Sequence, residues 1–255
     1  MARKPSLLPT EKGVEDVNIG SAKNPKMVKL SKELPPQVRS KYISLLSSFT
    51  NVFSWDYSDL KAYDMSIIQR VIPIKPNQKP FRQKLRRINP KLLPSIEKEV
   101  NWLYKAGIIV PIRFSDWISN LVPMHKKTSE IWLCIDFRNH NKVSLKDNYS
   151  LPNMDHILQR VVGASHMSLL DGYSGYNQIL VHEDDRDKTM FTTSWGTFHY
   201  AKMPFRLKKS GATFQQAMDI TFANEKYVFL VVYLDDLIVF SNSDEEHLYH
   251  LKIVF

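Results

Sequence analysis

Two adjacent aspartates, Asp235 and Asp236, lie between two apolar runs that are rich in β-branched and aromatic residues. Such runs are typical of strands, so residues 227–241 are predicted to form a β-hairpin with its turn at the two aspartates. Neighbouring carboxylates repel each other unless a cation binds them, and Mg²⁺ prefers oxygen ligands of this kind. The turn is therefore a candidate metal site, with an ordinary solvent-exposed turn as the alternative.

A third carboxylate, Asp171, follows the apolar run 167–170, which is a predicted strand. Strands placed side by side in one sheet would bring Asp171 next to the predicted turn. Three carboxylates at one sheet edge can hold two Mg²⁺ ions, which stabilise the attacking and leaving oxygens of an in-line phosphoryl transfer. The matching reaction is attack of a primer 3′-hydroxyl on the α-phosphate of a nucleotide, with pyrophosphate leaving.

Composition narrows the class of partner. The chain has 255 residues, 43% of them hydrophobic, and a formal net charge of +9. This charge favours an anionic partner, with nucleic acid first and an anionic membrane surface second. The single cysteine, Cys134, excludes an internal disulfide and indicates a reducing compartment. We see no secretory signal and no apolar run long enough to span a bilayer. With nucleic acid as the first candidate, no membrane partner is expected.

Helical and strand patterns alternate along most of the chain. Residues 1–31 lack periodicity and are predicted to be a flexible leader or linker. A helix is predicted to begin at Asn89-Pro90, to bury Leu93, Ile96, Val100, Leu103 and Tyr104, and to end at Gly107. Further helices are predicted at 36–49, 154–162, 212–222 and from Ser243, and strands at 108–112, 121–124, 132–137, 167–170, 191–193 and 198–200. The order predicts an α+β fold with a mostly antiparallel sheet.

A basic block precedes the helix that begins at Asn89. Its members are Lys75, Lys79, Arg82, Lys84, Arg86, Arg87 and Lys91. A solvated surface is the simpler interpretation of such a charge run. The functional alternative is a face that contacts the phosphate backbone of a nucleic acid.

Several ordered motifs surround the three aspartates. They are Leu-Asp-Gly-Tyr-Ser-Gly-Tyr-Asn-Gln-Ile at 170–179, Thr-Ser-Trp-Gly-Thr-Phe at 193–198, Met-Pro-Phe at 203–205, Gly-Ala-Thr-Phe-Gln at 211–215 and Tyr-Leu-Asp-Asp at 233–236, with Cys-Ile-Asp-Phe-Arg at 134–138 and Asn141. On these motifs, residues 32–255 resemble the reverse transcriptase of gypsy-type LTR retrotransposons. The resemblance implies the fingers and palm of a right-hand polymerase, incomplete at the carboxyl end and without a thumb.

The resemblance also implies roles for single residues. Asp171, Asp235 and Asp236 match the catalytic, metal-binding triad, which implies two Mg²⁺ ions as cofactors with Mn²⁺ as a substitute. The matches to nucleotide-binding positions are Tyr176, Phe205, Gln215, Lys126, Lys127 and Arg138. Each has a plainer alternative. Tyr176 and Phe205 could be core residues, Gln215 a surface residue and Arg138 a structural one, and Lys126 and Lys127 could belong to a plain exposed turn.

The implied function is that of an RNA-directed DNA polymerase. Its expected partners are an RNA and DNA primer-template, deoxynucleoside triphosphates and other segments of a polyprotein. The expected location is the cytoplasm, inside a virus-like particle for an active element, with the nucleus as the alternative. A viral RNA polymerase is disfavoured by Tyr176, because an aromatic wall under the sugar rejects a 2′-hydroxyl.

Six positions depart from the family pattern: Trp132, Arg206, His140, Ser150, Lys209 and Ser210. Trp132 stands where the family typically has an arginine that grips the triphosphate, so a bidentate phosphate contact is lost. Arg206 stands where the family has a glycine, which allows a positive φ or a close approach. His140 replaces a usual leucine. These departures suggest the competing hypothesis of a catalytically impaired nucleic-acid-binding remnant of a retrotransposon polyprotein.

Overall fold

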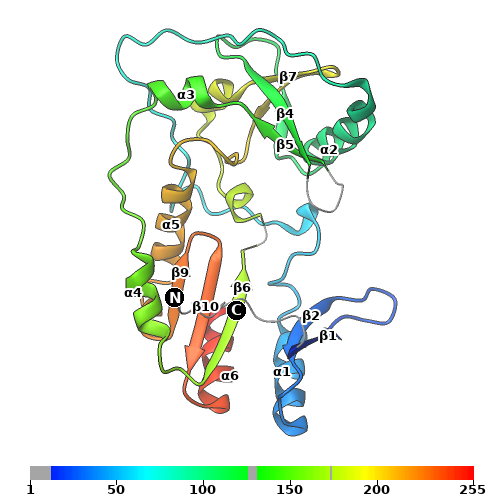
Figure 1. Ribbon diagram of the computed structural model, residues 1–255, viewed down its shortest axis with the longest axis vertical. Coiled ribbons are helices and arrows are strands. Elements are labelled where there is room, and N and C mark those ends of the chain that lie inside the picture. The colour runs from blue at the N-terminus through cyan, green and yellow to red at the C-terminus, as the bar shows by residue number, and fades with distance from the viewer. Residues whose placement is uncertain (1–12, 126–130, 173) are drawn as a thin grey trace, which may run out of the picture. The chain divides into compact units, whose positions relative to one another are not determined.

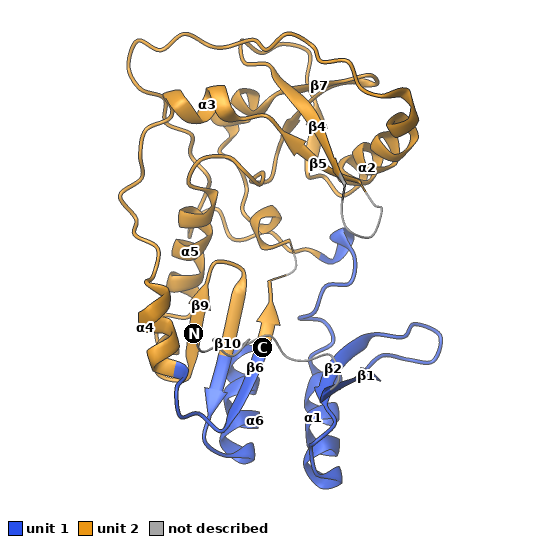
Figure 2. Cartoon of the chain, viewed as in Figure 1, with its two compact units in different colours: residues 1–59, 161–168, 239–255 blue, residues 60–160, 169–238 orange. Residues whose placement is uncertain are grey.

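A computed structural model describes residues 13–125, 131–172 and 174–255, and it divides into two compact units (Figure 2). Unit 1 comprises residues 1–59, 161–168 and 239–255, and unit 2 comprises residues 60–160 and 169–238. Both units mix helices and strands (Figure 1). The predicted α+β class is thereby confirmed.

The described part of unit 1 starts with a β-hairpin that the sequence pattern did not predict. Strands β1 (Val14–Asn18) and β2 (Met27–Ser31) pair in antiparallel fashion. The Asn18 side chain closes the connection, since its Oδ1 accepts hydrogen bonds from the amides of Gly20 (2.9 Å) and Lys26 (2.8 Å). The stretch predicted to be a flexible leader or linker thus contains two paired strands. Its strands carry many polar residues and bury little, so an apolar pattern could not reveal them.

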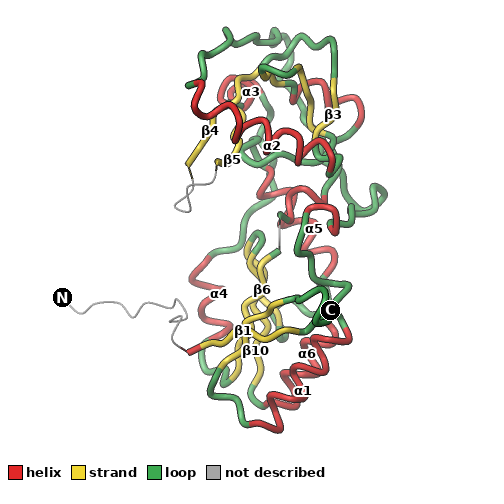
Figure 3. Tube along the Cα trace, turned by 90° about the vertical axis from the view of Figure 1, so that its right-hand side faces the viewer, coloured by secondary structure: helices red, strands yellow, loops and turns green. Residues whose placement is uncertain are grey.

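Two helices of unit 1 lie side by side, α1 (Pro36–Ser48) and α6 (Asp244–Val254) (Figure 3). The predicted cap of α6 is present, because the Ser243 side chain accepts a hydrogen bond from the Glu246 amide. His247 of α6 is 2% exposed and is hydrogen-bonded to Ser168 (2.8 Å) and Ser241 (3.0 Å). Burial lowers the pKa of His247 to about 4, so its ring is neutral near neutral pH.

Unit 2 contains a five-stranded sheet in the order β3-β8-β7-β4-β5. Only the β4–β7 pair is parallel, which agrees with the prediction of a mostly antiparallel arrangement. The sheet contains five of the predicted strands, which come from three separate parts of the sequence. Its strands are β3 (Ile109–Pro111), β4 (Ser119–His125), β5 (Ile131–Ile135), β7 (Phe191–Thr193) and β8 (Gly196–Tyr200).

Helix α2 (Leu93–Lys105) contacts this sheet through β3 and β5. The Asn89 side chain caps the preceding 3-10 helix (Pro90–Leu92) by accepting a hydrogen bond from the Lys91 amide, and Gly107 adopts φ +64° after the last turn. Both ends therefore follow the prediction. Tyr104 is 50% exposed, so its predicted burial is wrong; the buried residues of α2 are Ile96, Val100 and Leu103.

Three further helices belong mainly to unit 2. They are α3 (Arg138–Val143), α4 (Met154–Val161) and α5 (Ser210–Thr221). Unit 2 also contains short 3-10 helices at Gly175–Gln178 and Glu183–Thr189, and unit 1 contains one at Tyr57–Asp59. Helix α5 contacts β9 and is mostly buried, with Phe214 and Ala217 in the core. Among the described residues, no helix combines the length and apolar character needed to cross a membrane.

A second sheet has three strands in the order β6-β10-β9. The strands are β6 (His166–Asp171), β9 (Leu230–Tyr233) and β10 (Asp236–Ser241). Asp236 already belongs to β10, so the turn consists of Leu234 and Asp235. The predicted hairpin is present, but its turn lies one residue earlier than predicted.

Candidate active site

The end of β6 lies beside the β9–β10 turn. The amide of Gly172 donates a hydrogen bond to the carbonyl oxygen of Asp235 at 2.7 Å. A Cβ atom at Gly172 would lie 3.2 Å from that oxygen, so glycine permits this close approach. The sequence neighbours of the two bonded groups are Asp171 and Asp236. The fold therefore brings the three predicted carboxylates to one end of the sheet.

Electrostatics link the same three side chains. The pKa of Asp171 is raised, mainly by burial and then by the negative charges of Asp235 and Asp236. Throughout residues 13–125, 131–172 and 174–255, no three His, Cys, Asp or Glu side chains gather closely enough to hold a metal ion. The donor chemistry nevertheless fits Mg²⁺, which prefers carboxylate oxygens. A cation would also offset the repulsion between Asp171 and the two neighbouring aspartates.

Gln215 supports the turn from within the protein. Its side chain is 0% exposed, and its Oε1 accepts a hydrogen bond from the Leu234 amide at 2.8 Å. Its Nε2 donates to the carbonyl of Val232 (3.2 Å) and to Asp219 (2.9 Å). The prediction that Gln215 contacts a nucleotide is therefore wrong for this structure, because burial and internal hydrogen bonds use the whole side chain.

Asp219 was not singled out from the sequence. It receives hydrogen bonds from Gln215 and from the hydroxyl of Tyr149, and it forms an ion pair with Lys226 at 2.6 Å. Gln215 and Asp219 stand four residues apart on α5, a spacing at which glutamine and aspartate side chains meet on a helix. That spacing is the one signal in the sequence that points to their contact.

Tyr176 lies within a group of aromatic side chains. Its ring stacks on Phe214 with centroids 5.3 Å apart and meets the edge of Phe205 at 5.7 Å. Burial, followed by the charge of Asp235, raises the pKa of Tyr176 to about 12. Phe205 is 47% exposed and also packs against Trp132, with centroids 5.1 Å apart. Phe205 is therefore a surface residue and not a core residue, whereas Tyr176 is half-buried.

The turn that follows Phe205 holds Arg206 in the left-handed region, at φ +67°. The side chain of Asn141 fastens this turn, since its Nδ2 donates to the Arg206 carbonyl (3.0 Å) and its Oδ1 accepts from the Lys208 amide (2.7 Å). The backbone thus takes the conformation for which glycine is suited, although the residue is an arginine.

Arg138 forms hydrogen bonds with a nearby carboxylate, that of Asp136. Its Nε and one terminal nitrogen each donate to the Asp136 carboxylate at 2.7 Å, and Arg86 donates to the same carboxylate at 2.7 Å. These hydrogen bonds hold the pKa of Asp136 down at about 2. Because the Arg138 side chain is 76% exposed, its predicted contact with a nucleotide stays a prediction.

The other predicted cations fall into two groups. Lys126 and Lys127 lie outside the described residues. All seven members of the basic block are exposed. Two of these arginines already have carboxylate partners, because Arg82 pairs with Asp116 (3.3 Å) and Arg86 pairs with Asp136.

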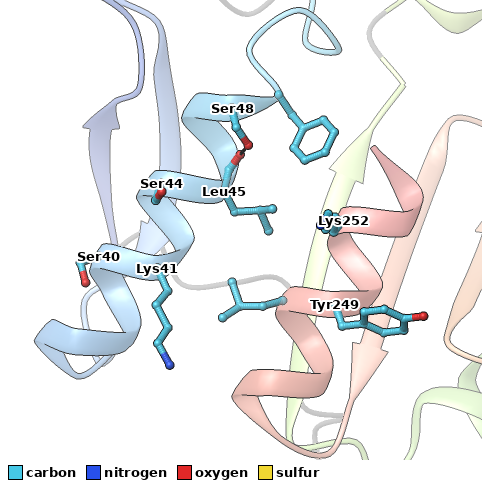
Figure 4. A pocket seen from close by; sticks show the side chains of 9 residues that line it. Ser40, Lys41, Ser44, Leu45, Ser48, Tyr249 and Lys252 are labelled. Carbon is cyan, nitrogen blue, oxygen red and sulfur yellow. Dashed lines mark hydrogen bonds between the residues drawn. The ribbon is translucent and has the colours of Figure 1, made fainter.

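A groove of about 620 Å³ lies between α1 and α6 within unit 1 (Figure 4). Its lining combines apolar and hydroxyl side chains with Lys41 and Lys252. Two of its serines donate to their own helix, Ser40 to the Gln37 carbonyl and Ser48 to the Leu45 carbonyl. The predicted carboxylates belong to unit 2, so this groove is not part of the candidate active site.

Comparison with known proteins gives the class of this chain. Residues 124–255, just over half of the chain, match the family model described as reverse transcriptase (RNA-dependent DNA polymerase). The chain therefore belongs to the reverse transcriptase family. Members of this family depend in general on divalent metal ions.

Individual relatives narrow the lineage. The Pol polyprotein from transposon gypsy of Drosophila melanogaster is 34% identical over 165 residues, which are 62% of this chain and 16% of that protein. The polyprotein from transposon 412 of the same organism is 30% identical over 232 residues, 89% of this chain and 18% of that protein. An RNA-directed DNA polymerase homolog from Oenothera berteroana is 39% identical over 48% of this chain and 88% of its own length. The predicted gypsy-type lineage is confirmed, and the chain spans about one sixth of the Drosophila relatives.

Solved structures share the fold. A crystal structure of prototype foamy virus protease-reverse transcriptase superposes with a TM-score of 0.75 at 21% identity, covering 87% of this chain and 29% of that one. A foamy viral protease-reverse transcriptase in complex with an RNA/DNA hybrid gives a TM-score of 0.71 at 20% identity, with 91% and 32% coverage. The predicted fingers and palm architecture is confirmed by this likeness.

Proposed function

We propose that this chain acts as an RNA-directed DNA polymerase that adds deoxynucleotides to the 3′-hydroxyl of a primer. The observation that carries the proposal is the hydrogen bond between the Gly172 amide and the Asp235 carbonyl, which sets the end of β6 beside the turn. Membership of the reverse transcriptase family supports the same reaction.

In this proposal Asp171, Asp235 and Asp236 hold two divalent ions, Mg²⁺ or Mn²⁺ in its place. When bound, the ions stabilise the charge that develops on the attacking and leaving oxygens. The contribution of the chain is to keep three carboxylates together at one sheet end, although burial and then their mutual repulsion raise the pKa of Asp171. Their ionised form is the ligand, so acidification should weaken cation binding.

The aromatic group beside the turn supplies the nucleotide pocket. Tyr176 is fixed by its stack on Phe214, so its ring is a rigid wall that would exclude a sugar 2′-hydroxyl. Phe205 is exposed enough to contact a bound nucleotide. Arg138, Lys126 and Lys127 are proposed to attract its phosphates, and the basic block to contact the primer-template backbone. Binding to a primer-template should then weaken as salt concentration rises, and a flat salt dependence would exclude that role.

The same assignment implies where the chain works. Its proposed partners are an RNA and DNA primer-template, deoxynucleoside triphosphates and other segments of a Pol polyprotein. We place it in the cytoplasm, within a virus-like particle if its element is active, with the nucleus as the alternative location.

Primer extension on an RNA template tests the polymerase. Wild-type protein should incorporate deoxynucleotides when Mg²⁺ or Mn²⁺ is supplied, and Asp235→Asn should abolish incorporation. Asp184→Asn is the matched control, because Asp184 is an exposed aspartate of the same unit. Incorporation that survives Asp235→Asn would contradict the assigned role of this carboxylate.

A second candidate function is nucleic-acid binding without polymerisation. Trp132 favours it, because this side chain packs against Phe205 where the family has a phosphate-gripping arginine. Retained primer-template binding with no incorporation would support this alternative. Restoring the family residues in a Trp132→Arg/Arg206→Gly double variant should then raise incorporation. If it does not, these two departures do not explain the impairment.

A further inference from the structure

Gln215 joins helix α5 to the β9–β10 turn through buried hydrogen bonds. Its amide oxygen accepts from the backbone of Leu234, and its amide nitrogen donates to the Val232 carbonyl on the other side of Tyr233. The two hydrogen bonds therefore hold the backbone on both sides of Tyr233. The residue that follows Leu234 is Asp235, one of the proposed metal ligands.

The backbone at this turn is unfavourable on its own. Leu234 adopts φ +56°, a left-handed conformation that costs a residue with a side chain about 1–2 kcal/mol. Strain of this kind persists only where surrounding structure holds it. The hydrogen bond from the Leu234 amide to Gln215 is a contact that can hold it. A side chain of α5 therefore contributes to the conformation of the metal-binding turn.

Asp219 determines which way the amide of Gln215 faces. An ionised carboxylate can only accept hydrogen bonds, so the amide nitrogen of Gln215, and not its oxygen, must face Asp219. Lys226 forms an ion pair with the Asp219 carboxylate at 2.6 Å, with both side chains 16% exposed, and the Tyr149 hydroxyl donates to the same oxygen. With the nitrogen so placed, the oxygen of Gln215 is left to receive the Leu234 amide.

We propose that Gln215, oriented by the Lys226–Asp219–Tyr149 cluster, is a positioning residue that fixes the turn carrying Asp235 and Asp236 for cation binding. The inference rests on the proposed function, because it assigns these aspartates to the cations. It names a residue that contacts neither a cation nor a nucleotide.

Three variants separate this role from simple packing. Gln215→Met keeps the length of the side chain and removes all three hydrogen bonds. Gln215→Glu keeps the acceptor for Leu234 and places a second carboxylate against Asp219. Gln216→Met is the matched control, because Gln216 is the next residue on α5 and is exposed. Urea denaturation of each variant checks that the protein is folded under the assay conditions.

The first readout is hydrogen exchange at the Leu234 amide. In Gln215→Met its exchange should rise about tenfold, the effect of losing one net hydrogen bond, while the amide of Val231 in β9 keeps its protection. Gln216→Met should leave both amides unchanged. Unchanged exchange at Leu234 in folded Gln215→Met would overturn the inference, and so would an equal loss of protection across all of β9.

The second readout is Mn²⁺ binding measured by electron paramagnetic resonance, with no substrate present. Wild-type protein should bind Mn²⁺ at a site that Asp235→Asn removes. Both Gln215→Met and Gln215→Glu should bind it several-fold more weakly, and Gln216→Met as tightly as wild type. If Gln215→Met binds Mn²⁺ as tightly as wild type, the inference is overturned but the proposed function is not. If wild-type protein has no Mn²⁺ site that depends on Asp235, the proposed function and the cation part of the inference both fail.

Discussion

His140 should make the protein sensitive to mild acid. This histidine is 2% exposed, packs against Trp117 with ring centroids 4.9 Å apart, and has its Nε2 buried without a hydrogen-bond partner. Its pKa is lowered to about 4, first by burial and then by the positive charges of Lys188 and Arg70. In the unfolded chain a histidine titrates near 6.5. Above that pH both states are neutral, and stability is lost as pH falls from about 6.5 towards 4.

The size of the effect follows from the two pKa values. Relative to pH 7, His140 should lower the free energy of unfolding by about 1.2 kcal/mol at pH 5.5 and by about 2.4 kcal/mol at pH 4.5. Below pH 4 the loss levels off, because the ring then protonates in the folded state as well. His140→Leu, which introduces the usual residue of the family, should remove this dependence.

At pH 7 the same change should be nearly neutral or stabilising. It removes a hydrogen bond to Ser144 (3.2 Å), worth about 1 kcal/mol, and it removes a buried nitrogen without a partner, which costs about 1–3 kcal/mol. Ser144 keeps its hydrogen bond to the His140 carbonyl at 2.9 Å. The substitution therefore leaves no new group unsatisfied.

Urea denaturation followed by tryptophan fluorescence at pH 7, 5.5 and 4.5 measures these differences. The advantage of His140→Leu over wild type should grow by the amounts given above as pH falls. His156→Leu controls for removing a histidine, and it should retain the acid sensitivity of wild type because it leaves His140 in place. An advantage that stays constant across the three pH values would refute the reasoning.

Three further substitutions test other features of unit 2. Arg206→Gly should stabilise the protein by about 0.5–1 kcal/mol in urea denaturation, because relieving the backbone strain of an arginine at positive φ gains more than the added entropy of the unfolded chain costs. Arg87→Gly is the control: Arg87 is exposed and has no positive φ, so this substitution should destabilise the protein. Asp136→Asn should lower the free energy of unfolding by about 1–2 kcal/mol at pH 7, after discounting for the exposure of its arginine partners. Since the pKa of Asp136 is lowered in the folded protein, this difference in stability is present above pH 3.8 and disappears as pH falls towards 2. If the difference is the same at pH 2.5 as at pH 7, the ion pairs are not its cause. Gly175→Ala should lower the free energy of unfolding by about 1–3 kcal/mol, because the added Cβ would lie 2.4 Å from the Phe214 ring. The same clash should weaken the near-ultraviolet circular dichroism of the Tyr176–Phe214 stack. Gly13→Ala is the control, since its Cβ meets nothing within 4 Å.

The elements with local signals were predictable from the sequence. Asn89 and Gly107 mark the start and end of the α2 region because their side-chain chemistry and backbone freedom act over a few residues. The β9–β10 hairpin followed from its two apolar runs. Its turn was misplaced by one residue, since nothing local indicates that a leucine adopts φ +56° when a distant glutamine holds its amide.

The parts that failed depend on distant partners. Gln215 is polar, and a helical pattern predicts a polar residue at the surface; its burial is tolerated because Val232 and Leu234 satisfy its amide. The β1–β2 hairpin is held by Asn18 and by backbone pairing, and it has little apolar periodicity. The proximity of Asp171 to the turn was predicted only by assuming that their strands share one sheet.

The division of the chain has a consequence for its synthesis. Unit 1 is assembled from residues 1–59, 161–168 and 239–255, so α1 meets its neighbour α6 only after nearly 200 intervening residues have been translated. At about 5–20 residues per second this delay amounts to roughly 10–40 s. Throughout that interval the buried Tyr42 of α1, whose ring centroid lies 6.2 Å from that of His247 in α6, lacks this neighbour. A ribosome-bound nascent chain that stops before residue 239 should therefore leave this helix accessible to chaperones or proteases, whereas in a chain that includes α6 the helix should be protected.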